Sequence, residues 1–179
     1  SNNEPAPLWI RTNTLKITRE ELVKKLEEEG VEVRIGKRAP ESLLLEKVGS
    51  LEKLPSFQEG LFTVQDESSQ LVAHVLKPQP GEKVLDACGA PGGKTTHLAQ
   101  LMDNQGEIFA FDIHSHKIPL IEELAKRLGI RIIVAQVGDA RELLGIELAS
   151  CHKVLVDAPC SGLGVIRRRA DMRWQKEEQ

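Results

Sequence analysis

Residues 86–96 read Asp-Ala-Cys-Gly-Ala-Pro-Gly-Gly-Lys-Thr-Thr and continue a short apolar segment that begins at Lys83. Glycines allow positive φ angles and let a ligand approach the backbone closely. A helix that begins after such a turn presents free backbone N–H groups to a carboxylate or a phosphate. We therefore predict a β-strand, a tight turn and a helix, in which the turn is either a ligand site or only a structural connection.

Strand and helix patterns alternate around this turn. An early helix is expected to begin near Asp66 and to end at the run Lys77–Gly81. The apolar segments that follow are Lys83–Ala87, Glu107–Phe111, Arg131–Ala135 and Lys153–Val156, with helical patterns at Lys94–Leu101 and Ile118–Leu128. Strands that recur about every 25 residues between helices are typical of a parallel, doubly wound α/β sheet. Such sheets bind ligands at the C-terminal ends of their strands.

The first 60 residues have a different pattern, in the order strand, helix, strand. Trp9–Asn13 suits an extended segment, and Thr18 suits a helix N-cap because a glutamate follows three residues later. The helix is expected to stop at Gly30, and Val31–Ile35 alternates apolar and polar residues as a half-buried strand does. We predict that residues 1–60 form a small α+β subdomain, packed on an α/β domain of residues 61–179.

The composition fits a globular protein, since 40% of the 179 residues are hydrophobic and 28% are charged. No stretch approaches the ~20 apolar residues that a membrane helix needs, so no membrane contact is expected. Three cysteines are too few and too irregularly spaced for a disulfide framework, which favours the cytoplasm. The first five residues do not resemble a secretory signal. The sequence predicts no metal site and does not indicate an oligomeric state.

The net charge of −3 argues against a protein that binds nucleic acid through charge alone, because phosphate contacts need clustered cations. Basic residues near the start of the chain are most simply explained as a solvated face. A denser group near the C-terminal end is either a solvated face or a contact site for a nucleic-acid backbone: Arg167, Arg168, Arg169 and Arg173.

Aspartates follow three of the predicted strands. Asp112 closes the second strand, where a carboxylate suits the hydroxyl groups of a ribose or, alternatively, the cap of a helix. Asp139 follows the third strand and suits either an adenine amino group or a turn. Asp157 ends the fourth strand and precedes Cys160 in a glycine-rich loop, where that cysteine is either reactive or simply a small buried residue.

Three nucleotide-binding classes compete for these residues. Gly89–Thr95 resembles a Walker A loop, but it is one residue too short, which counts against an NTPase. A P-loop enzyme also has no need of a carboxylate at Asp112. The residues by themselves leave NAD and S-adenosylmethionine open.

Taken together, these motifs resemble the Fmu/Sun family of ribosomal small-subunit RNA cytosine-C5 methyltransferases. Gln65–Ser68 and Val165–Asp171 are also similar to that family. The resemblance implies a class I methyltransferase (Rossmann-like) fold that is incomplete at the C-terminus, S-adenosylmethionine as the cofactor and a 16S-type ribosomal RNA as the substrate. The residues implied to hold the cofactor are Cys88, Gly89, Ala90, Pro91, Gly92, Gly93, Lys94, Asp112, Asp139 and Asp157.

The resemblance also implies a mechanism in which a cysteine thiolate adds to C6 of cytosine, C5 takes the methyl group, and elimination frees the product. It assigns Asp157 to N3 of the base and Cys160 to product release. The attacking cysteine of the family lies in a Thr-Cys-Ser motif that this sequence lacks, so we expect cofactor binding without turnover. Alternatively Cys160 attacks, as in some DNA methyltransferases. Gly89 replaces the family's usual alanine and is expected to loosen the turn slightly.

Overall fold

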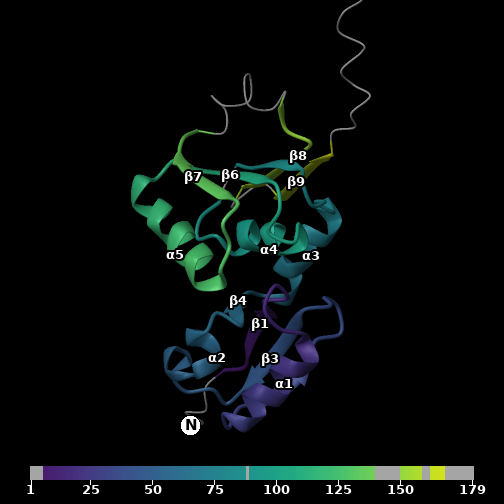
Figure 1. The fold of residues 1–179 in the computed structure, drawn as a ribbon, viewed down its shortest axis with the longest axis vertical. Coiled ribbons are helices and arrows are strands. Elements are labelled where there is room, and N and C mark those ends of the chain that lie inside the picture. The colour runs from purple at the N-terminus through teal and green to yellow at the C-terminus, as the bar shows by residue number, and fades with distance from the viewer. Residues whose placement is uncertain (1–5, 88, 140–149, 159–161, 168–179) are drawn as a thin grey trace, which may run out of the picture.

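The computed structural model describes residues 6–87, 89–139, 150–158 and 162–167, which form two units stacked along the long axis (Figure 1). The N-terminal unit is built on a four-stranded sheet in the order β2-β3-β1-β4. The second unit is built on a five-stranded sheet in the order β7-β6-β5-β8-β9. None of the described helices is long and apolar enough to cross a bilayer.

The N-terminal unit packs helices against an antiparallel sheet. Its elements are β1 (Leu8–Thr12), α1 (Arg19–Glu28), β2 (Glu32–Ile35), β3 (Ser42–Glu46), η1 (Leu51–Lys53), α2 (Pro55–Gln58) and β4 (Phe62–Val64). The predicted cap of α1 is confirmed, since Thr18 Oγ1 accepts a hydrogen bond from the backbone N–H of Glu21 at 3.1 Å. Leucines from α1 and β3 form the core of this unit together with Ile10 and Phe62.

Two strands of this sheet have no counterpart in the prediction. β3 is missed because Leu43, Leu44 and Leu45 form a continuous apolar run rather than an alternating one. β4 has only three residues, and it pairs with β1, so the first sheet continues past residue 60, where we expected the unit to end. β2 is an edge strand, which leaves Ile35 53% exposed rather than half-buried.

The second unit is an α/β sheet, as predicted. Its elements are α3 (Glu67–Leu76), β5 (Lys83–Asp86), α4 (Gly93–Leu101), β6 (Glu107–Asp112), η2 (Ser115–Lys117), α5 (Ile118–Leu128), β7 (Ile133–Val137), β8 (Lys153–Ala158) and β9 (Gly162–Arg167). β5 is parallel to β6 and to β8, and β6 is parallel to β7. The three described α-helices of this unit contact one face of the sheet, through Val84, Ile108 and Leu155.

β9 is a correction to the sequence analysis. We expected a glycine-rich loop through Gly164, but Gly162–Arg167 pairs antiparallel with β8. The residues after Gly162 include Val165 and Ile166, whose β-branched side chains favour a strand. Gly162 and Gly164 therefore belong to a strand.

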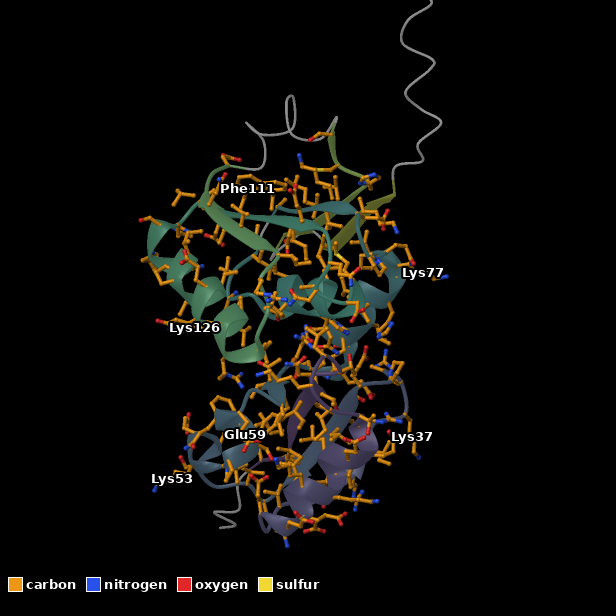
Figure 2. All side chains as sticks on the ribbon, in the orientation of Figure 1. Lys37, Lys53, Glu59, Lys77, Phe111 and Lys126 are labelled. Carbon is orange, nitrogen blue, oxygen red and sulfur yellow. The ribbon has the colours of Figure 1, made fainter. Side chains whose placement is uncertain are left out.

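Polar side chains join the two units at the junction visible in Figure 2. Asn13 Nδ2, in the loop after β1, donates to the carbonyls of Gly60 and Leu128, each at 2.9 Å. Arg127 on α5 donates to the carbonyls of Phe57 and Phe62 and lies over the Phe57 ring at 4.0 Å. Because a buried polar group without a partner is costly, such bonds fix the position of one unit on the other.

A buried acid and two histidines occupy the same junction. Glu41 Oε1, just before β3, lies 2.8 Å from His74 Nε2 on α3 and 3.1 Å from His97 Nε2 on α4. Burial and the nearby Arg11 charge lower the pKa of His97 to about 4, so its ring is neutral at pH 7. Burial alone would raise the pKa of Glu41, but its bonds to the two imidazoles outweigh that effect and lower the pKa to about 2.

We expect the free energy of unfolding to decrease as the pH falls from 6.5 to 4. Because the folded pKa of His97 lies below its ordinary value of 6.5, the unfolded chain takes up a proton first. The stability from neutral His97, on the order of 3 kcal/mol, is complete above pH 6.5 and is lost as the pH approaches 4. The lowered pKa of Glu41 adds a loss of the same sign below pH 4.5.

Chemical denaturation at a series of pH values measures this effect. His97→Gln should flatten the dependence between pH 6.5 and 4, whereas His116→Gln, at an exposed histidine of η2, should leave it unchanged. A parent chain with constant stability across that interval would contradict the assignment.

Candidate functional site

The parallel strands bring aspartates together at one edge of the second sheet. Asp86 ends β5, Asp112 ends β6, and Asp139 follows β7 by two residues. The backbone N–H of Gly138 donates to the carbonyl of Asp112 at 3.0 Å, so the ends of β6 and β7 are adjacent. The chain order reverses beside β5, with β6 and β7 on one side and β8 on the other. Open α/β sheets bind ligands at such a switch point.

The glycine-rich turn lies at the same edge, between β5 and α4. Thr95 Oγ1, in the first turn of α4, donates to Asp86 Oδ2 at 2.6 Å and lies 3.1 Å from the carbonyl of Gly89. The backbone N–H of Gly89 donates to the carbonyl of Phe111 in β6 at 2.9 Å. Asp86 thus holds the turn closed from inside the protein, where its carboxylate is 1% exposed.

Gly89 and Gly92 are required for different reasons. A Cβ on Gly89 would lie 2.9 Å from Ala110 Cβ, so the turn is packed tightly there, and an alanine would fit only after a small shift. We expected Gly89 to loosen the turn, whereas the structure shows close contact around it. Gly92 has φ of +106°, a conformation that residues with a side chain rarely adopt.

Asp112 and Asp139 are both half-buried at the strand ends. Asp112 Oδ1 accepts a hydrogen bond from the backbone N–H of His114 at 2.9 Å. This bond holds the turn that leads into η2. One carboxylate oxygen of Asp112 therefore has a structural role in the backbone turn before that helix. A ligand role for either aspartate stays a prediction.

Several predicted site residues lie outside the described part of the chain, namely Cys88, Cys160, Arg168, Arg169 and Arg173. Asp157 and Arg167 are described by their backbone alone. Asp157 lies near the C-terminal end of β8, at the same sheet edge as Asp86. Arg167 pairs with Lys153 at the opposite end of β8, about 13 Å away along the strand at roughly 3.3 Å per residue. The backbone thus separates the two predicted sites.

Sequence reasoning missed the residues that support the turn from below. Asp86 and Thr95 were part of the quoted motif, but neither was assigned a role. Arg11 and Gln65 are buried against α4, where Arg11 contacts the buried Thr96, and these contacts join residues more than 50 positions apart in the chain. The available signal was the pair of hydroxyl residues Thr95 and Thr96 in the first turn of the helix.

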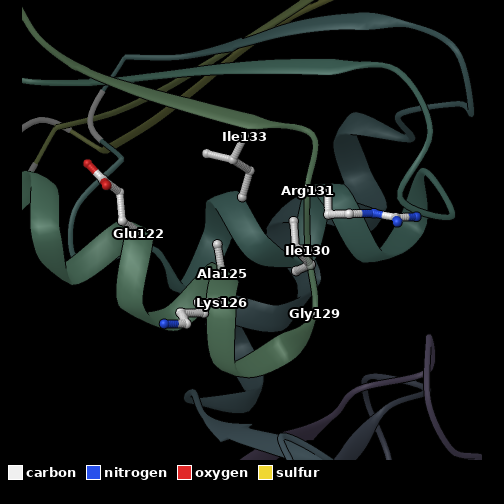
Figure 3. Close-up of a pocket in the computed structure, with 7 residues that line it drawn as sticks. All are labelled: Glu122, Ala125, Lys126, Gly129, Ile130, Arg131 and Ile133. Carbon is white, nitrogen blue, oxygen red and sulfur yellow. The ribbon is translucent and has the colours of Figure 1, made fainter.

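A separate hollow lies between α5 and β7 (Figure 3), with a volume of about 450 Å³. It is open to solvent, and none of its lining residues belongs to the glycine-rich turn. Its lining residues are Glu122, Ala125, Lys126, Gly129, Ile130, Arg131 and Ile133. Because it contains none of the aspartates at the strand ends, we place the candidate site at the turn rather than here.

Glu41, His74 and His97 offer ligand atoms within 4.8 Å of one another, a donor set that zinc accepts. Both imidazole Nε2 atoms already lie at hydrogen-bonding distance from the carboxylate. The buried positive charge of Arg11 acts on both His97 and Glu41, and it disfavours a divalent cation at this position. We therefore interpret the cluster as a structural part of the junction.

Comparison with known proteins matches both units. Residues 73–179 match the family model "16S rRNA methyltransferase RsmB/F", and residues 1–52 match the "RsmF/B-like, ferredoxin-like domain". A probable ribosomal RNA small subunit methyltransferase B from Bacillus subtilis is 46% identical over 97% of this chain. The chain spans 39% of the length of that relative.

Solved structures agree with this match. A methyltransferase homolog protein from Pyrococcus horikoshii is 38% identical, with a TM-score of 0.78 over 94% of this chain and 55% of its own. NSun6 from Pyrococcus horikoshii, solved with SFG, is 27% identical, with a TM-score of 0.79 over 88% of this chain and 64% of its own. These matches support a ferredoxin-like antiparallel sheet followed by a methyltransferase-like α/β unit.

We expect Gly92→Ala to lower the free energy of unfolding by about 1–3 kcal/mol, because a side chain at φ of +106° is strained. The new Cβ would also lie 3.2 Å from Ile121 Cα, a backbone atom of α5 that cannot move aside easily. Thermal and chemical denaturation measure the loss. Gly49→Ala, which enters open space, is the matched control, and equal losses in the two variants would refute the special role of Gly92.

Proposed function

This chain belongs to the RsmB/F family of 16S rRNA methyltransferases, and from that premise we propose that its glycine-rich turn and strand ends bind S-adenosylmethionine. The observation that carries the proposal is the position of Asp86, Asp112 and Asp139 at adjacent strand ends beside the start of α4. A nucleoside with a carboxylate-bearing tail matches this arrangement of acids beside the backbone N–H groups of a helix start.

Each part of the site would hold a different part of the cofactor. The backbone N–H groups at the start of α4 would receive the methionine carboxylate. Asp112 would accept hydrogen bonds from the ribose hydroxyls, and Asp139 would accept one from the adenine amino group. Asp86 is already bonded to Thr95, so it would shape the turn rather than bind the ligand.

For the whole protein we propose methylation of C5 of a cytosine in small-subunit ribosomal RNA. Bound S-adenosylmethionine would supply the methyl group. Asp157, near the strand end of β8, would support N3 of the base, and Cys160 would assist product release. The arginines at 167–169 and Arg173 would contact the RNA backbone.

Since the chain spans 39% of its Bacillus relative, the chain itself is proposed to bind cofactor without turnover. A fragment that binds RNA without catalysis is the second candidate, favoured by the absence of a Thr-Cys-Ser motif from this sequence.

Thr95 argues against an ATPase or GTPase. In a P-loop, the hydroxyl after the lysine binds Mg²⁺. Here the Thr95 hydroxyl donates to Asp86 at 2.6 Å, inside the protein, so it is occupied by a structural bond.

We expect S-adenosylhomocysteine, the demethylated product, to bind the folded chain, and Asp112→Asn to weaken that binding about tenfold. A neutral amide accepts ribose hydroxyl protons less strongly than a carboxylate, and tenfold corresponds to about 1.4 kcal/mol. Isothermal titration calorimetry measures both dissociation constants. Asp103→Asn, an exposed position after α4, is the control and should bind like the parent. Binding of ATP–Mg²⁺ in place of S-adenosylhomocysteine would overturn the proposal in favour of an NTPase.

Labelled S-adenosylmethionine and unmodified ribosomal RNA test turnover. The chain alone is expected to transfer no methyl group, because the proposed attacking cysteine is not in its sequence. Efficient transfer that disappears in Cys160→Ser would contradict this expectation and make Cys160 the nucleophile.

A further inference from the structure

We infer that Arg11, on β1 of the ferredoxin-like unit, is a positioning residue for the cofactor site, because it fixes the two peptide groups that begin α4. This inference rests on the proposed cofactor function. It goes further because the N-terminal unit then supports the cofactor site, although Arg11 itself does not touch the cofactor.

The Arg11 side chain is completely buried between the units. Its Nη1 donates to the carbonyl of Gly93 at 2.7 Å and to Gln65 Oε1 at 2.6 Å. Its Nη2 donates to Thr96 Oγ1 at 2.9 Å, and its Nε donates to Gln100 Oε1 at 3.2 Å. Three of these four acceptors belong to α4, so the guanidinium is fastened mainly to that helix.

Thr96 extends the reach of Arg11 by one residue. Its hydroxyl accepts from Arg11 and donates to the carbonyl of Gly92 at 2.7 Å. Arg11 therefore holds the carbonyl of Gly93 directly and that of Gly92 through Thr96. Gln100 is held in turn from the N-terminal unit, since its Nε2 donates to the carbonyl of Thr12 at 2.9 Å.

Because a peptide group is planar, hydrogen bonds that fix a carbonyl also fix the direction of the N–H in the same group. The carbonyl of Gly92 and the N–H of Gly93 share one planar group, as do the carbonyl of Gly93 and the N–H of Lys94, and in a trans peptide the two point in opposite directions. The Gly93 carbonyl is held by Arg11 and the Gly92 carbonyl by Thr96, so the N–H group of each peptide points away from the residue that holds its carbonyl. Backbone N–H groups at the start of a helix are the ones to which anions bind in proteins.

The two glycines make this support necessary. Glycine has the greatest backbone freedom of any residue, so a Gly-Gly helix start has many alternative orientations. A site that is already ordered avoids the entropic cost of ordering when the ligand binds. Burial lowers the pKa of Arg11 to about 9, so it is still protonated at neutral pH.

The test compares Thr96→Val and Thr96→Ser in the full 179-residue chain. Thr96→Val removes the hydroxyl relay while conserving side-chain volume, and Thr96→Ser keeps the relay. At a temperature well below both unfolding transitions, we expect Thr96→Val to weaken S-adenosylhomocysteine binding about fivefold or more and Thr96→Ser to bind like the parent. Arg11→Lys, which keeps the charge but loses the forked geometry, should weaken binding about tenfold.

Arg19→Lys is the matched control. Arg19 Nη1 contacts the carbonyls of Gly36, Ala39 and Ser42, all within the N-terminal unit. Its loss should lower the unfolding temperature and leave the dissociation constant unchanged. Hydrogen exchange gives a second readout, because the amides of Gly93 and Lys94 should exchange faster in Arg11→Lys and Thr96→Val than in Arg19→Lys.

The outcomes separate the two proposals. If the parent binds and the Arg11 and Thr96 variants lose only thermal stability, with unchanged dissociation constants and exchange rates, Arg11 is merely structural and this inference is overturned. If the folded parent does not bind S-adenosylhomocysteine, the proposed function fails as well. Faster exchange at Gly93 and Lys94 would then show only that Arg11 orders the turn, without a role in cofactor binding.

Discussion

A fully buried guanidinium is tolerated only where hydrogen-bond acceptors surround it, because an ion moved out of water without partners is very costly. Arg11 meets that requirement with four acceptors from α4 and from Gln65. The same requirement determines the position of the N-terminal unit, since any displacement of β1 from α4 would leave the charge without partners. This constraint therefore helps to determine how the two units are arranged.

The other junction residues reinforce the same helix. Glu41 reaches His97 on α4 and His74 on α3, so a carboxylate of the first unit lies near Arg11 and balances its charge. Glu67, at the start of α3, accepts the backbone N–H groups of Arg38 and Ala39 and the hydroxyl of Ser42. It thereby fixes the turn before β3 that carries Glu41. Both buried acids stabilise the interface from opposite sides.

Local features of the sequence predicted most of the second unit and little of the junction. The bounds of α5 were predicted correctly because its apolar face repeats at helical spacing, and the Thr18 cap followed from one local hydrogen bond. β9 was missed because its glycines resemble a loop when taken without the partner strand. The contacts of Arg11 span 54 to 89 positions, and no local pattern distinguishes a buried arginine from a solvated one. For that reason the sequence analysis grouped Arg11 with the basic residues that it expected to form a solvated face.

The segment that connects the two units contributes residues to both of them. The two family models match residues 1–52 and 73–179 and leave the connection between them unmatched. That connection supplies β4 to the first sheet and Gln65 to Arg11. Gln65 also approaches Gly93, since a Cβ there would lie 3.5 Å from Gln65 Nε2. A segment that completes one sheet and contacts the helix start of the other cannot act as a passive linker. The ferredoxin-like unit and the cofactor turn are therefore parts of one packed structure, joined through the residues that a division of the chain near residue 60 would separate.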